Sequence, residues 1–188
     1  MKFIEKLDFT ADIEKMREDL NALLQQISWP EEDIHKKLPG GQLGITYRPG
    51  AENLWLDASG SLYDKEAGKF ISTESDFTEM NPLVGSYTQE ILKQLSYYTG
   101  KKFGRIRYMR QQSKRGLSIH RDFEQRYHFV LYTNPNALFG ETVNDNELAA
   151  KCYHVPANGH FYKVDTTRDH FVYNGGWEDR VHLVICEA

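Results

Sequence analysis

Apolar residues recur at intervals of three and four in two segments of the first half of the chain. Thr10 can cap a helix over residues 10–27, and a second segment with the same period follows Asn81-Pro82. Gly100 stands where a C-terminal glycine cap belongs. The pattern therefore predicts two helices with buried faces formed by Ile13, Met16, Leu20, Leu23, Leu24 and Ile27 and by Val84, Tyr87, Ile91, Leu95 and Tyr98.

The rest of the chain is dominated by short β-like segments. Turn sequences such as RPGAEN, TNPN, PANG and YNGG separate them. Two helices and then short antiparallel strands predict a mainly β fold with flanking helices, either a sandwich or a barrel. The expected strands are 42–47, 53–57, 104–111, 126–133, 151–155, 160–165, 170–174 and 180–187.

Two of these strands carry charged and imidazole side chains on one face only. Arg126 and His128 alternate with the apolar residues of the strand at 126–133, and Arg180 and His182 do so in the strand at 180–187. An open sheet whose mixed face meets water would show this pattern. A closed sandwich with a polar pocket inside would show it as well, so periodicity alone leaves both arrangements open.

Length and charge limit the functional classes. A chain of 188 residues is long enough for one domain with a substantial core. The net charge of −4 and the absence of a basic block argue against nucleic acid as the main partner. No stretch approaches the roughly 20 apolar residues that span a bilayer, and the N-terminus has no apolar leader. We therefore expect a cytoplasmic protein without a membrane partner, and its oligomeric state stays open.

The segment GLSIHRDF contains a histidine and a carboxylate two residues apart. His120 and Asp122 would project to the same side of an extended backbone, although the segment could also be an ordinary loop. His170 begins a predicted strand about fifty residues later. Two histidines and one carboxylate form the facial triad that binds Fe(II) and leaves coordination positions open. The spacing therefore indicates a metal site formed by His120, Asp122 and His170.

An arginine follows the second histidine at the beginning of the last predicted strand. Arg180 lies ten residues beyond His170. A guanidinium group can bind a carboxylate through two parallel hydrogen bonds. Arg180 is thus a candidate for holding a dicarboxylate at the floor of a pocket, and His182, on the same face, can border that pocket.

These motifs resemble one known family. His120-x-Asp122, His170 and Arg180, with RYHFVLYTNP after the first pair and RVHLVI at the last residue, are similar to aspartyl/asparaginyl β-hydroxylase-like oxygenases, which depend on iron(II) and 2-oxoglutarate and include bacterial proline hydroxylases. The resemblance covers roughly residues 40–188. It implies a double-stranded β-helix, or jelly roll, with helices on one outer face.

The resemblance also implies a role for each residue of these motifs. Arg180 would pair with the distal carboxylate of 2-oxoglutarate, and Arg126 and His128 would match an Arg-x-His pair that helps to hold this cosubstrate. It implies one oxygenase domain over 1–188, with helical support and leading strands in 1–100 and the catalytic core in 101–188. The iron ligands that it implies are His120, Asp122 and His170.

The activity implied is hydroxylation of an unactivated C–H bond with Fe(II), 2-oxoglutarate and O2. Asp122 departs from the aspartyl/asparaginyl branch toward the proline hydroxylases, which favours an amino acid or a similar small molecule over a peptidyl side chain. Residues that select the substrate are expected in loops at 48–80 and 135–150.

Three alternatives remain at this point. A JmjC-type protein hydroxylase or demethylase shares the triad but usually anchors 2-oxoglutarate with lysine. A non-oxidative metal-binding cupin would not need Arg180, and a catalytically silent jelly roll would not need the triad.

Overall fold

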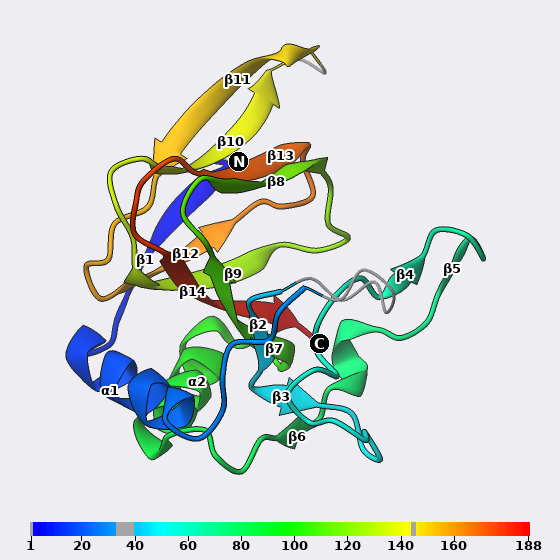
Figure 1. Ribbon diagram of the computed structural model, residues 1–188, viewed down its shortest axis with the longest axis vertical. Coiled ribbons are helices and arrows are strands. Elements are labelled where there is room, and N and C mark those ends of the chain that lie inside the picture. Colours follow the sequence, from blue (N-terminus) through cyan, green and yellow to red (C-terminus); the bar gives the residue numbers. More distant parts are fainter. Residues whose placement is uncertain (1, 33–39, 144–145) are drawn as a thin grey trace. The chain divides into compact units, whose positions relative to one another are not determined.

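The computed structural model describes residues 2–32, 40–143 and 146–188, and strands predominate over helices (Figure 1). The helices are α1 (Ile13–Leu24), α2 (Ser86–Thr99) and the short 3-10 helix η1 (Glu74–Asp76). The strands are β1 (Ile4–Thr10), β2 (Gln42–Gly44), β3 (Thr46–Tyr47), β4 (Tyr63–Asp64), β5 (Lys69–Phe70), β6 (Glu79–Met80), β7 (Phe103–Gln111), β8 (Arg115–His120), β9 (Arg126–Tyr132), β10 (Ala137–Val143), β11 (Asn146–His154), β12 (His160–Val164), β13 (His170–Asn174) and β14 (Arg180–Glu187).

The chain divides into two compact units. Unit 1 comprises Met1–Ile13 and Arg110–Leu183, and unit 2 comprises Glu14–Met109 and Val184–Ala188. The expectation of a single domain whose catalytic core begins at residue 101 stays a prediction.

Unit 1 contains the strands of a jelly roll. One sheet has the order β11-β10-β13-β8, and β1, β12, β9 and the first half of β14 follow one another in the other. From β8 to β14 the chain passes repeatedly from one sheet to the other, and neighbouring strands in the first sheet are antiparallel. This connectivity is that of a double-stranded β-helix, so the predicted fold class is confirmed.

The mixed face of β9 lies inside unit 1. Val130, on the same face as Arg126 and His128, belongs to a buried cluster with Phe139 of β10 and Val172 of β13. His128 is buried as well. Because β10 and β13 belong to the opposite sheet, the mixed face meets the other layer and not water. The closed sandwich with polar residues inside is therefore the correct alternative.

Unit 2 contains both helices, β2 and most of β7. Asp19 of α1 accepts a hydrogen bond from the backbone N–H of Thr88 at 2.7 Å, and this bond joins α1 to α2. The hydroxyl groups of Thr88 and Tyr108 lie 3.3 Å apart, so α2 also contacts β7. Gly100 caps α2 with a φ of 66°, as the sequence predicted. None of the described helices is long and apolar enough to cross a membrane.

Some sequence predictions of local structure were wrong. Residues 53–57 form a turn, because the side chain of Asn53 accepts hydrogen bonds from the backbone N–H groups of Trp55 and Leu56. The segment 135–150 is not a loop but holds β10 and most of β11, although residues 144–145 lie outside the described chain. Strands β1 and β8 were not predicted, and both are largely exposed edge strands of their sheets.

A buried ion pair connects η1 to β7 in unit 2. Nε and Nη2 of Arg105 each donate to one oxygen of the Glu74 carboxylate at 2.7 Å, and both side chains are nearly inaccessible to water. Glu74→Gln should lower the free energy of unfolding by about 3–5 kcal/mol, because it leaves the guanidinium buried without its counter-charge. Urea denaturation measures this change.

A solvent-exposed pair supplies the control. Lys101 and Glu187 form an ion pair of 2.9 Å, and the Lys101 side chain is 48% exposed. Lys101→Met should therefore change the free energy of unfolding by at most about 1 kcal/mol. An equal effect of the two substitutions would contradict this assignment of the Glu74–Arg105 pair.

Candidate metal centre

Antiparallel pairing of β8 with β13 brings two predicted ligands together. His120 is the last residue of β8, and it lies opposite His170, the first residue of β13, with ring centroids 4.3 Å apart. Leu117 pairs with Val172, so a regular ladder would place Ile119 opposite His170. A register shift of one residue places His120 there instead. Bulges near functional sites often redirect a side chain in this way.

Asp122 lies just beyond the end of β8. Its backbone N–H donates to the carbonyl of Thr166 at 2.8 Å, and its Oδ2 lies 3.7 Å from Nε2 of His170. Nη1 of Arg126 lies 2.8 Å from the same oxygen. One ligand atom from each of His120, Asp122 and His170 lies within 4.8 Å of the others. The three residues predicted as metal ligands are thus together, at a separation that a single ion can bridge.

The hydrogen bonds of both histidines leave one ring nitrogen of each able to bind a metal. Nδ1 of His120 lies 2.7 Å from the carbonyl of Ser118, and Nδ1 of His170 lies 2.9 Å from that of Arg168. A carbonyl only accepts, so each Nδ1 carries the proton and Nε2 keeps its lone pair in the neutral ring. Burial lowers the pKa of His170, and His120 and Arg126 act in the same direction. The neutral imidazole that a metal requires is therefore favoured at His170.

The carboxylate of Asp122 can supply the third donor atom to a metal. Oδ2 is buried, and within the described chain no donor reaches it with hydrogen-bond geometry, although Arg126 lies at ion-pair distance. Two imidazole nitrogens and one carboxylate oxygen form the donor set of non-haem Fe(II) sites. The residues present therefore fit the metal that the sequence predicted.

A second carboxylate lies next to His170 but is already engaged. Glu141 of β10 pairs with His170 in register. Its Oε1 accepts the hydroxyl proton of Tyr153 at 2.5 Å, and its Oε2 accepts a hydrogen bond from Arg168 at 3.1 Å. Both oxygens have side-chain partners, and Glu141 is not among the grouped ligands.

The turn at 165–169, between β12 and β13, contacts both ligand segments. Beside the carbonyl groups of Thr166 and Arg168, it supplies the carboxylate of Asp169, which accepts two hydrogen bonds from Arg121 at 2.5 and 2.7 Å. Arg121 stands between His120 and Asp122 in the sequence. The turn thus joins the segment that carries His120 and Asp122 to the segment that carries His170, a function that sequence reasoning missed.

Arg180 lies inside unit 1, at the beginning of β14. It is 6% exposed, its guanidinium carbon lies 4.8 Å from the centroid of the Phe139 ring, and its Nη2 donates to Nδ1 of His182 at 3.1 Å. Nδ1 of His128 lies 3.4 Å from the same His182 atom. Burial lowers the pKa of Arg180 to about 9, which leaves the guanidinium charged near neutral pH.

The two residues of the Arg-x-His pair predicted on β9 contact different parts of the site. Arg126 contacts the carboxylate of Asp122, whereas His128 lies beside His182. Both side chains lie on the inner face of the strand, two residues apart, which corresponds to about 7 Å along an extended backbone. β9 thus connects the candidate metal ligands to the buried arginine.

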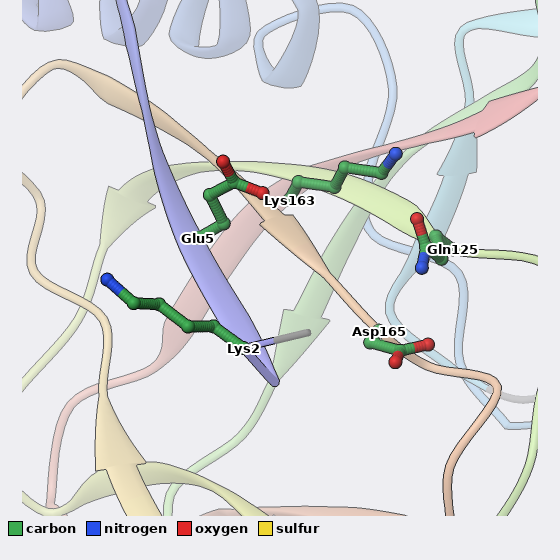
Figure 2. A pocket seen from close by; sticks show the side chains of 5 residues that line it. All are labelled: Lys2, Glu5, Gln125, Lys163 and Asp165. Carbon is green, nitrogen blue, oxygen red and sulfur yellow. The ribbon is translucent and has the colours of Figure 1, made fainter.

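A pocket elsewhere on unit 1 offers no comparable chemistry. Figure 2 shows its lining of Lys2, Glu5, Gln125, Lys163 and Asp165, in which two ammonium groups and two carboxylates alternate. None of the candidate ligands lines it. We therefore assign it no role.

Comparison with known proteins decides the family. The family model of aspartyl/asparaginyl beta-hydroxylase matches residues 10–186, nearly the whole chain. The chain belongs to this family. Its members are hydroxylases. Membership implies that this protein uses Fe(II), 2-oxoglutarate and O2. Among curated proteins, no relative matches the chain.

Similar solved structures are distant. A cupin domain from Bordetella pertussis Tohama I is 18% identical with a TM-score of 0.37, over 45% of this chain and 80% of that one. An oxidoreductase of the 2OG-Fe(II) oxygenase family from Burkholderia pseudomallei is 16% identical with a TM-score of 0.45, over 57% of this chain and 59% of that one.

The ion pair between Arg121 and Asp169 yields a prediction. Arg121→Met should weaken Mn(II) binding about tenfold, because partners that orient metal ligands typically contribute at least that much. Asp169→Asn should have the same effect, and the double variant should bind no more weakly than either single variant, since both remove one interaction. Equilibrium dialysis with Mn(II) measures the affinities.

Arg115→Met is the matched control. Arg115 is an exposed arginine at the first position of β8, at the opposite end of that strand from His120. This variant should bind Mn(II) as the unaltered protein does. Unchanged affinity in the Arg121→Met protein would show that the 165–169 turn does not hold the ligands through this ion pair.

Proposed function

We propose that this chain hydroxylates an amino acid or an amino-acid-like small molecule, with His120, Asp122 and His170 as the ligands of Fe(II). The observation that carries the proposal is the convergence of these three side chains, with both Nε2 atoms left as acceptors and Oδ2 of Asp122 buried beside them. Family membership supplies the class of reaction.

Arg180 is the proposed anchor of the distal carboxylate of 2-oxoglutarate. The contact with His182 is the only hydrogen bond that its guanidinium makes within the described part of the chain, and no carboxylate there pairs with it. A buried cation surrounded by neutral side chains attracts an anion strongly. A non-oxidative cupin would have no need for such a group.

Arg126 and His128 support this arrangement from β9. One residue contacts the metal end, through Asp122, and the other contacts the arginine end, through His182. The step between them along the strand is about 7 Å. This is the scale of a short dicarboxylate, so β9 can present polar groups along the length of a bound cosubstrate.

The residues of the chain position and orient the reactants. When bound, Fe(II) would supply oxidative chemistry in which O2, 2-oxoglutarate and the substrate are converted to succinate, CO2 and the hydroxylated substrate. The carbonyl groups of Ser118 and Arg168 fix the histidine rings. The buried side chains of Phe139 and Val172 add apolar surface to the interior of unit 1.

The small-molecule class is supported by Asp122. A carboxylate ligand is the feature by which this chain resembles the hydroxylases of free amino acids. A peptidyl or protein side chain is the alternative substrate. The expected cytoplasmic location also stays a prediction.

The proposal is tested by the formation of succinate from 2-oxoglutarate in the presence of Fe(II) and O2. At least one of the twenty amino acids should stimulate it, and the stimulated rate should vanish in Asp122→Ala, which removes a ligand. Asp179→Ala is the control, because this carboxylate is 42% exposed and its ion pair with Arg110 is long, at 3.7 Å.

A set of peptides assayed in parallel separates the two substrate classes. Stimulation by peptides alone would move the substrate to peptidyl side chains and would leave the hydroxylase class intact. Turnover in the Asp122→Ala protein at the rate of the unaltered protein would contradict the assignment of the triad.

A further inference from the structure

The buried arginine has an unusual partner. Nη2 of Arg180 donates to Nδ1 of His182, and His182 is 1% exposed. Because the guanidinium has no lone pair to offer, Nδ1 must be the acceptor, and the proton of the neutral ring is on Nε2. Nε2 is buried and has no hydrogen-bond partner among the residues that the structure describes.

The surroundings keep His182 neutral. Burial lowers the pKa of His182 well below its usual value, and the charge of Arg180 and the rings of His128 and His154 act in the same direction. Phe139 adds an apolar surface against both side chains, with its ring centroid 6.0 Å from that of His182. The arginine is therefore oriented by a group that carries no charge.

A neutral acceptor differs from the carboxylate that usually accompanies a buried arginine. A carboxylate would orient the guanidinium equally well, but it would also neutralise the positive charge and compete with any incoming anion. An imidazole nitrogen fixes one N–H of the fork and leaves the charge available. In this chain the orientation and the charge of Arg180 are thus supplied separately.

We propose that His182 is a positioning residue that aims Arg180 at the distal carboxylate of the 2-oxo acid and so determines selection of a dicarboxylate. This inference rests on the proposed function, since it assigns Arg180 to that carboxylate. His182 acts through Arg180, with Nδ1 as the acceptor that holds Nη2. The spacing of Arg180 and His182 on one strand face could indicate proximity but not this contact.

The experiment measures binding without turnover. The Mn(II)-loaded protein is titrated with 2-oxoglutarate and, separately, with pyruvate, which lacks the distal carboxylate, and the two dissociation constants are compared by calorimetry. Three substitutions at one position separate the contributions: His182→Leu removes the acceptor, His182→Gln retains a neutral acceptor, and His182→Glu adds a negative charge. Arg180→Met and His160→Leu are the reference variants.

His182→Leu should weaken 2-oxoglutarate binding about tenfold and leave pyruvate binding unchanged, because a misaligned charged hydrogen bond affects only the distal carboxylate. His182→Gln should stay within about threefold of the unaltered protein. His182→Glu should bind 2-oxoglutarate about a hundredfold more weakly, since the new carboxylate pairs with Arg180. His160→Leu, whose ring contacts β1 through Leu7, should change neither affinity.

The outcomes that contradict the inference are distinct from those that contradict the proposed function. If Arg180→Met loses the preference for 2-oxoglutarate over pyruvate but His182→Leu and His182→Glu keep it, His182 does not position the arginine. Should His182→Leu fail to fold, the contrast between Gln and Glu, which are similar in size, still decides. If the unaltered protein shows no preference, or Arg180→Met retains it, the proposed anchor itself is wrong.

Discussion

The antiparallel pairing of β8 with β13 is the constraint on which the whole site depends. It brings His120 and His170 together although they are about fifty residues apart, and a shift of one residue in the ladder selects His120 in place of Ile119. Side chains alternate between the faces of a strand, so a slip in register would turn the ligand away from its partner. The register of the sheet therefore determines which side chains can form the metal centre.

Two carbonyl groups and one carboxylate of the 165–169 turn hold the ligand segments that the strand register brings together. Thr166 holds the main chain of Asp122, Arg168 holds the ring of His170, and Asp169 holds Arg121. Both ligand segments therefore contact the same turn. Arg180 is arranged differently, within an apolar interior, with a histidine in place of a counter-ion.

The sequence predicted His120 and Asp122 from their spacing, and it predicted the other site residues from their places at the beginning of apolar strands. His170, Arg180 and Arg126 stand at the first positions of β13, β14 and β9, where predicted and observed boundaries agree. β8 escaped prediction because an exposed edge strand rich in polar residues has no buried face to produce a pattern. The register shift and the contact between Arg180 and His182 depend on tertiary packing, which periodicity does not encode.

Anaerobic visible spectroscopy tests whether one site binds Fe(II) and 2-oxoglutarate together. Addition of 2-oxoglutarate to the Fe(II)-loaded protein without O2 should produce a weak charge-transfer band, because the cosubstrate would coordinate the metal held by His120, Asp122 and His170. The band should require both components. A spectrum that does not change when both are present would show that 2-oxoglutarate does not bind at the metal.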